Sequence, residues 1–290
     1  MSPSATRRPE RPPVSAAGAR RTRVPVIVGL FVVAVVASAL IGWRFAREST
    51  PVTGPILLIS IDPLPADRLS FYGGHTPTPN LDRLAASGTV FTRAYAHAAA
   101  SLPAHTSLLT GQLPFDHGVR DDVGFRLADD AQTLASRLGD RGFETAAAVS
   151  NFLLRAETGL GAGFAHYDAD RPAAPAESLV PSVERDSAAT ARAATTWLDA
   201  QNSARFFYAL QLNGTPGPSD TGESRRLTEE ADAVTIGAAD AAVGAVLDTL
   251  RRKGWYDAAL VVVTSTNGAP ADATGDTSRV VGYASAIMRA

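Results

Sequence analysis

The stretch Pro55-ILLISI-Asp62 decides the fold of this 290-residue chain. It is a short apolar run rich in β-branched residues, and it ends in a carboxylate. Such runs are typical of strands that are buried on both faces of a parallel sheet. The carboxyl ends of parallel strands form the edge at which open α/β sheets bind ligands. The pattern therefore predicts that Asp62 lies at a functional edge of a sheet.

Strand-like and helix-like segments alternate along the rest of the chain. Further strands are expected at 89–95, 144–150, 205–212, 259–266 and 279–288, and helices at 81–88, 101–111, 131–140, 186–202 and 226–252. Alternation of this kind implies a mostly parallel sheet with helices on both faces. We therefore predict an α/β fold with three layers, αβα.

Residues 24–43 form an uncharged apolar run that is long enough to cross a bilayer as a helix. Six arginines precede this run and only two follow it closely, which places the N-terminus in the cytoplasm and the main domain outside it. A cleaved signal peptide is the alternative, because Ala37-Ser38-Ala39 imitates a peptidase site. The uncleaved anchor is favoured, since the apolar run continues to Trp43. The domain is exported in either case.

The predicted organisation has four parts. They are a disordered arginine-rich cytoplasmic tail at 1–23, a transmembrane helix at 24–43, a linker at 44–54 and a folded domain at 55–290. Beyond residue 47 the chain carries 19 basic and 28 acidic side chains. A domain this acidic is a poor general binder of nucleic acid, so any anionic substrate would need a local cation.

The segment Ser101–Gly111, SLPAHTSLLTG, places a hydroxyl two residues before a proline that suits the first turn of a helix. A hydroxyl in this position lies near the unpaired N–H groups and the dipole of a helix N-terminus, which favour an anionic ester group. Ser101 is therefore a candidate nucleophile. It can also be read as an N-cap residue whose hydroxyl satisfies one backbone N–H.

This segment resembles the nucleophile motif of the sulfatase family, within the alkaline phosphatase superfamily. Ser101 falls on the nucleophile position, and His105 falls on a position that the family fills with Arg or His. Other blocks resemble the family in the same order, among them ISIDPLPADRLSFYGG, TPTPNLDRLAASGTVFTRAYA, LPFDHGVRDD and ADAAVGAVLDTLRRKGWYDAALVVVTSTNG. The resemblance implies the three-layer fold and the hydrolysis or transfer of sulfuric or phosphoric esters.

The resemblance also implies a divalent metal, which would be calcium, magnesium, manganese or zinc. Its ligands would fall on Asp62, Thr266 and Asn267, with Ser101 and His105 as the catalytic pair. Pro63 and Thr266, however, stand where the family has carboxylates. Because divalent cations of this kind are held mainly by charged oxygen ligands, we expect an eroded metal site.

The groups that would protonate the leaving group are also expected to be missing. Gln211 stands where relatives often carry His, and no Gly-Glu-His-Gly loop follows Gly268. The domain is thus expected to be shortened at its C-terminus. The incomplete set favours the N-cap interpretation of Ser101.

Three hypotheses follow. The favoured one is a membrane-anchored, extracytoplasmic pseudoenzyme that binds an anionic sulfate or phosphate ester or docks a partner protein. The alternative is an active metal-dependent ester hydrolase that uses Ser101, with Asp62 and Asn267 as ligands and Asp67 in place of the lost carboxylate. A third is a fragment whose missing C-terminal part matters.

Overall fold

The computed structural model describes residues 28, 30–38, 54–170, 185–214, 222–266 and 283–289, and for 222–230 and 283–289 it describes the backbone alone. The chain divides into two compact units, residues 1–51 and residues 52–290. The predicted tail at 1–23 lies outside the described residues, as does nearly all of the predicted linker at 44–54.

Two apolar helical stretches bear on the membrane prediction. Residues 30–38, inside the predicted span, are helical, and Leu30 and Phe31 are 67% and 70% exposed. Within the part of the chain that the structure describes, the helix that is long and apolar enough to cross a membrane is Ala231–Arg252. Over half of its most apolar stretch is buried against the protein core, as expected of a core helix.

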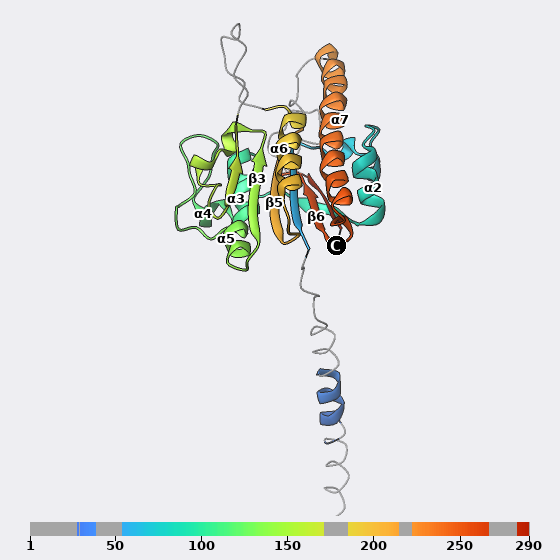
Figure 1. Cartoon of the computed structure of the whole chain (residues 1–290). Helices are drawn as coiled ribbons and strands as arrows, with labels where there is room; N and C mark the ends of the chain where they lie inside the picture. Colours follow the sequence, from blue (N-terminus) through green and yellow to red (C-terminus); the bar gives the residue numbers. More distant parts are fainter. Residues whose placement is uncertain are drawn as a thin grey trace, which may run out of the picture. The chain divides into compact units, whose positions relative to one another are not determined.

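The strands of the described residues form one mixed sheet with the order β2-β7-β6-β1-β5-β3-β4. Their bounds are β1 (Ile56–Asp62), β2 (Thr89–Tyr95), β3 (Glu144–Val149), β4 (His166–Asp168), β5 (Phe206–Asn213), β6 (Leu260–Thr264) and β7 (Tyr283–Arg289). β1 pairs in parallel with β5 on one side and β6 on the other, and β3 continues the parallel set to β4. β7 runs antiparallel to β6 and β2, so the sheet is mostly parallel (Figure 1).

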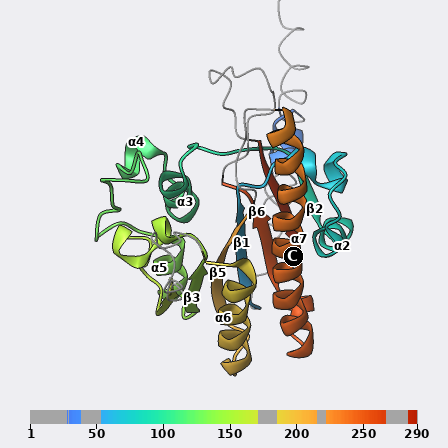
Figure 2. The same cartoon turned by 90° about the horizontal axis from the view of Figure 1, so that it is seen from above.

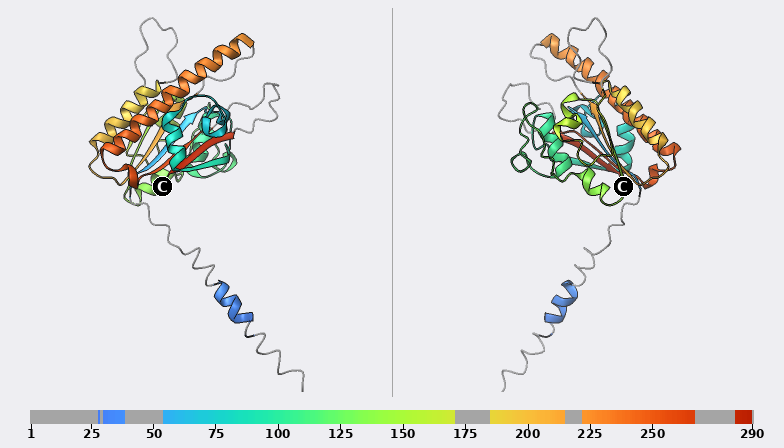
Figure 3. Two further views of the ribbon diagram at one scale, coloured as in Figure 1. Left: turned by 90° about the vertical axis from the view of Figure 1, so that its right-hand side faces the viewer. Right: turned by 60° about the vertical axis from the view of Figure 1, so that its left-hand side comes forward.

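Helices cover both faces of this sheet, and the predicted αβα architecture is confirmed (Figure 2). One face carries α2 (Pro79–Ser87), α6 (Ser187–Ala200) and α7 (Gly222–Arg252), and the other carries α3 (Ser101–Thr110), α4 (Pro114–His117) and α5 (Leu134–Gly139). α7 runs beside α6, and its first turns extend past the sheet (Figure 3). The buried apolar side chains form two clusters, one between the sheet and each helical layer.

The side chains of β1 point alternately to the two faces of the sheet, and this alternation determines the face on which the candidate site lies. Leu57, Ile59 and Ile61 join the cluster beneath α2, α6 and α7. Leu58 joins the cluster beneath α3, and Ser60 lines a cavity on that same face. Since successive side chains of a strand point to opposite faces, Asp62 also belongs to the α3 face.

The strands and helices predicted for the folded domain are found, most of them with shifted ends, whereas only residues 28 and 30–38 of the predicted span 24–43 are described. α5 is shorter than predicted and begins at a capping box formed by Thr133 and Ser136. β6 ends at Thr264, two residues earlier than predicted, so Ser265 and Thr266 follow the strand instead of ending it. The three-residue strand β4 was not predicted, because a run this short has no usable periodicity.

A buried carboxylate joins α2 to α7. Asp240 of α7 is 2% exposed, and its Oδ1 accepts hydrogen bonds from the backbone N–H groups of Asn80 (3.1 Å) and Leu81 (2.8 Å). Its Oδ2 accepts from Asn80 Nδ2 at 2.8 Å. Thr78, the N-cap residue of α2, makes no side-chain hydrogen bond that caps this helix. Asp240 therefore satisfies the amides that the first turn of α2 leaves unpaired.

We predict that Asp240→Ala lowers the free energy of unfolding by about 3 kcal/mol, because it leaves buried N–H groups without an acceptor. The matched control is Asp248→Ala on the same helix, where an exposed carboxylate pairs with Arg251. That variant should cost less than about 1 kcal/mol. Urea unfolding of the purified chain, followed by circular dichroism, measures both values, and equal losses would contradict the capping role.

Candidate active site

The carboxylate of Asp62 lies where three parallel strands end, and it is 8% exposed. Its Oδ1 accepts hydrogen bonds from the Thr266 backbone N–H and from Ser265 Oγ (3.2 Å), both of which follow β6. The Ser265 hydroxyl in turn accepts from the Leu64 N–H at 3.1 Å. After β5, the Gly214 N–H donates to the Asp62 carbonyl oxygen at 3.0 Å. The predicted edge position of Asp62 is confirmed.

The His105 ring projects from the sheet-facing side of α3 into the same place and is 5% exposed. Its Nε2 lies 3.0 Å from Asp62 Oδ2 and 2.9 Å from Ser60 Oγ, and its Nδ1 lies 2.8 Å from the Ser101 carbonyl oxygen. Thr266 Oγ1 is 3.4 Å from Nδ1. A carbonyl oxygen only accepts, so Nδ1 carries a hydrogen. His105 and Asp62 therefore form a close buried pair, which is an ion pair when Nε2 also carries a proton.

The pKa values of two buried histidines, His105 and His117, are shifted in opposite directions. Burial disfavours the charged form of His105, but the charge and hydrogen bond of Asp62 and the bond to Ser101 outweigh it and raise the pKa of His105. Burial prevails at His117 and lowers its pKa. The Nδ1 of His117 accepts from the Val119 N–H at 3.1 Å, which suits a neutral ring.

Ser101 is the first residue of α3, and its side chain does not cap the helix. Ala100 is the N-cap residue, and no side-chain cap hydrogen bond forms there. The N-cap interpretation of Ser101 is therefore wrong. The Leu102 N–H donates to Asp122 Oδ1 at 2.7 Å, so a carboxylate from the loop after α4 lies at this end of the helix. That carboxylate occupies a position at which a helix favours an anion.

The structure describes two of the three predicted metal ligands, Asp62 and Thr266. Asn267 lies outside the described residues. Thr266 reaches Asp62 through its backbone N–H, and both carboxylate oxygens of Asp62 face donors. Among side chains of residues 54–170, 185–214 and 231–266, no three from His, Asp and Glu are grouped closely enough to hold a metal ion. Of the predicted ligands that the structure describes, Asp62 alone brings an anionic oxygen, whereas a divalent cation of this kind is held mainly by several charged oxygens.

Two further predicted positions, Gln211 and Asp67, do not join the pair of Asp62 and His105. Gln211 is engaged in the fold, and Asp67 lies apart. Gln211 is buried, its Oε1 accepts from the backbone N–H groups of Ser150 and Asn151 at 2.9 Å each, and its Nε2 donates to the Leu212 carbonyl oxygen. Gln211 therefore ties β5 to the loop after β3. Asp67, suggested as a substitute ligand, is exposed in the 3-10 turn Ala66–Arg68.

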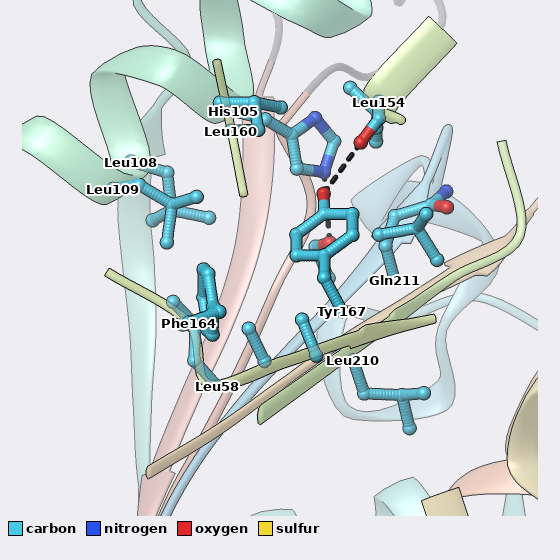
Figure 4. A pocket seen from close by; sticks show the side chains of 14 residues that line it. Leu58, His105, Leu108, Leu109, Leu154, Leu160, Phe164, Tyr167, Leu210 and Gln211 are labelled. Carbon is cyan, nitrogen blue, oxygen red and sulfur yellow. Dashed lines mark hydrogen bonds between the residues drawn. The ribbon is translucent and has the colours of Figure 1, made fainter. Parts of the chain in front are cut away.

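A small cavity of about 30 Å³ lies between α3 and the sheet (Figure 4). Its lining is mainly apolar, and its polar members are Ser60, His105, Tyr167 and Gln211. The Tyr167 hydroxyl donates to the Leu154 carbonyl oxygen at 2.5 Å. A volume of this size holds about two waters, which is too little for a sulfate or phosphate ester group.

Sequence reasoning missed three polar residues of the site. Ser60 could have been found, because a side chain two residues before Asp62 in a strand shares its face. Ser265 directly precedes the predicted ligand Thr266 in the sequence, but no role was predicted for it. Asp122 gave no local signal, because its bond to Leu102 spans 20 residues and depends on the path of the loop after α4.

Comparison with known sequences identifies one family. The family model "Sulfatase" matches residues 55–279. Two curated relatives are an N-acetylgalactosamine-6-O-sulfatase of Bacteroides thetaiotaomicron, 38% identical over 95 residues, and arylsulfatase A of Bos taurus, 40% identical over 98 residues. Each alignment covers 31% of this chain and 19% of the relative.

Solved structures share the fold. The phosphonate monoester hydrolase of Agrobacterium radiobacter matches with a TM-score of 0.61 at 18% identity, over 81% of this chain and 68% of that structure. A 2-O GAG sulfatase matches with a TM-score of 0.64 at 17% identity, over 81% of this chain and 64% of that structure. The chain thus spans about two thirds of these structures.

We predict that NMR titration of the histidine side chains finds His105 with a pKa above 6.5 and His117 with a pKa below it. His105→Gln and His117→Gln assign the two signals. A His105 signal that titrates below 6.5 would contradict the ion pair with Asp62.

The raised pKa of His105 also sets a pH dependence of stability. Its pairing contributes fully below the unfolded value of 6.5 and is lost as the pH rises through the raised folded value. We predict that His105→Gln lowers the free energy of unfolding more at pH 6 than at pH 9. Urea unfolding at the two pH values measures the difference, and a loss that is independent of pH would mean that folding does not shift the pKa of His105.

Proposed function

Because the chain belongs to the sulfatase family, we propose that it is a pseudoenzyme of that family, a membrane-anchored and exported domain that does not hydrolyse sulfate or phosphate esters. One observation carries this proposal. The Asp62 carboxylate, which the resemblance assigns to a metal, lies 3.0 Å from the His105 ring and accepts two further hydrogen bonds from the loop after β6.

Ester hydrolysis places three demands on a site. It needs a cation against the non-bridging oxygens, a nucleophile in line with the leaving group, and an acid that protonates that group. Family members typically use a divalent metal as the cation. Here the His105 ring lies 3.0 Å from the Asp62 carboxylate, and the side-chain oxygen of Gln211 accepts hydrogen bonds from backbone N–H groups. Among the described residues, Gln211 therefore does not offer Ser101 the acid that ester hydrolysis needs.

Asp122 bears on what such a domain would bind. Its carboxylate bonds to the first free amide of α3, beside Ser101. An anionic ester approaching this helix end would meet a like charge, which is unfavourable. A role in docking a partner protein is therefore favoured over binding a sulfate or phosphate ester.

The anchor is the second part of the proposal. Residues 24–43 are uncharged, and arginines are concentrated on their N-terminal side. The described apolar side chains at 30–38 are all exposed to the surroundings of the helix. Both features suit a single span with the N-terminus in the cytoplasm.

A second candidate function is a weak hydrolase that uses Ser101. It is favoured by the finding that the Ser101 side chain does not cap α3 although it lies in the first turn of that helix. The backbone carbonyl oxygen of Ser101 is also hydrogen-bonded to His105 Nδ1 at 2.8 Å. The nucleophile of such a hydrolase would be the Ser101 hydroxyl alone.

We predict that the purified chain does not release nitrophenol from p-nitrophenyl sulfate, p-nitrophenyl phosphate or a nitrophenyl phosphonate above the level of Ser101→Ala. Magnesium, calcium, manganese and zinc are each added in turn, because the family is typically metal-dependent. Ser87→Ala, at the exposed end of α2, is the matched serine control. Turnover that persists in Ser87→Ala and disappears in Ser101→Ala would establish the hydrolase instead.

We predict that protease added to intact cells, or to spheroplasts where an outer barrier exists, digests the region 54–290 and spares the tail 1–23. The reason is the excess of arginine on the N-terminal side of the predicted span. Lysed cells, in which both parts become accessible, serve as the control. Protection of the domain would reverse the orientation, and a mature chain that begins at Leu40 would show a cleaved signal.

A further inference from the structure

We infer that residues 113–130, which comprise α4 and the loop after it, form a docking surface for a basic, amphipathic segment of a partner protein. We call these residues the α4 surface. The inference rests on the proposed function, which favours docking a protein over binding an ester. It goes further, since it names the surface and the chemistry of the partner.

Exposed apolar side chains are concentrated on the α4 surface. Seven large apolar side chains are exposed in residues 54–170, 185–214 and 231–266, and four of them belong to this surface, namely Leu113, Phe115, Val123 and Phe125. Phe115 and Val123 are 81% and 77% exposed. Single exposed apolar side chains are normal on a soluble domain, whereas a group of them is typical of an interaction site.

The segment that carries these side chains is fixed to the domain. Val119 and Leu127 are buried in the cluster beneath α3, and between them Asp122 accepts a hydrogen bond from the start of α3. The guanidinium of Arg120 lies over the Phe115 ring, 5.7 Å from its centroid, which joins the loop to α4. A partner would therefore bind apolar groups that are already held in place, and such preorganisation lowers the entropic cost of binding.

The α4 surface adjoins the candidate active site. α4 lies on the side of α3 that faces away from α7 (Figure 2), so helices of the other layer do not cover it. Asp122, which bonds to the Leu102 N–H, is followed directly by the exposed Val123. A partner bound here would thus extend to the helix end at which Ser101 lies.

The charge of the surface indicates the kind of partner. It carries five acidic and two basic side chains, namely Asp116, Asp121, Asp122, Asp129 and Asp130 against Arg120 and Arg126. Arg126 is paired with Asp129, and Arg120 is engaged with Phe115. Apolar side chains within an acidic surrounding are complementary to a segment that combines apolar side chains with lysine or arginine.

The same charge disfavours other occupants. A second copy of this chain, bound through the same surface, would bring two acidic patches together. A membrane surface with anionic headgroups and a nucleic acid would each meet like charge as well. A basic segment of another protein is therefore the occupant that the observations favour.

The competing explanation is that these side chains are exposed without a function. The two explanations differ in what an apolar, basic probe does. A docking surface discriminates between basic and acidic probes and loses affinity when an apolar anchor is removed, as interfaces do at their central aromatic residues. A surface without a function does neither.

The test places a reporter on the surface itself. Because the chain contains no cysteine, Val123→Cys attaches one environment-sensitive dye there, and Val234→Cys attaches it to an exposed position on α7 as the control. The full chain, in nanodiscs of phosphatidylcholine, is titrated with a helical peptide that has leucine on one face and lysine on the other. A peptide with glutamate in place of lysine and one with serine in place of leucine are the matched probes.

We expect the leucine–lysine peptide to change the dye signal at residue 123 and not at residue 234. Its affinity should be at least tenfold higher than that of either matched probe. In the labelled Val123→Cys chain, Phe115→Ser should weaken binding at least tenfold, since it removes the most exposed aromatic anchor. Phe115 lies mostly outside the core, and circular dichroism verifies that this variant is folded.

A second comparison tests the charge. Asp116→Asn together with Asp121→Asn should weaken binding at least threefold, because both acidic groups are exposed on the α4 surface. Asp140→Asn together with Asp248→Asn removes the same charge at exposed positions elsewhere and should leave the affinity unchanged. Equal losses in the two double variants would mean that only the net charge of the chain attracts the peptide.

Several outcomes would overturn the inference. One is equal binding of the lysine and glutamate peptides, and another is the absence of any signal at residue 123. A dye that is already buried in nanodiscs but not in detergent would show that lipid is the occupant. A dye signal that rises with the concentration of the chain in detergent would show a second copy instead.

The outcome for the proposed function is separate. Ester turnover by wild type that depends on Ser101 would defeat the pseudoenzyme proposal, whatever the peptide titration shows. Discrimination among the peptides with no turnover supports both proposals. No discrimination and no turnover would leave the protein a pseudoenzyme, but one whose α4 surface is not its docking surface.

Discussion

Much of this structure depends on satisfying one buried carboxylate. Asp62 ends the central strand of the sheet, where an ionised group without partners would be strongly unfavourable. Its partners come from the loop after β6 and from the sheet-facing side of α3. The edge of the sheet, the position of α3 and the path of residues 265–266 are thus fixed by the same group.

The molecule keeps a family scaffold while the contacts at its edge favour a different chemistry. The parallel sheet still delivers Asp62 and the first turn of α3 to one place, as the resemblance implied. The carboxylate, however, is paired with the His105 ring, and the Leu102 N–H at the start of the helix donates to Asp122. Fold and reaction are separable in this way because the scaffold depends on packing and strand pairing, while the reaction depends on a few charged atoms.

The limits of sequence reasoning can be seen at individual residues. The position of Asp62, the extent of α2 and the strand at 89–95 followed from periodicity and from Gly and Pro signals, which are local. The role of Ser101 was misjudged because N-caps are recognised by residue type, whereas the amide of Leu102 took its acceptor from a loop 20 residues away. The sequence also did not predict that β7 runs antiparallel to β6, because the residue pattern of a strand does not specify its neighbour.

The sequence by itself determined the three-layer α/β architecture and the arrival of Asp62 at the carboxyl edge, because these depend on hydrophobic periodicity and on the order of the elements. It also indicated the family, through the resemblance of its sequence blocks to those of sulfatases. Only the tertiary structure decided what the carboxylate binds. Ser265 is 203 residues from Asp62 along the chain, and Ser60 is 45 residues from His105. Hydrogen bonds require donors within about 3 Å, and no pattern of spacing specifies such distances between segments that only packing brings together.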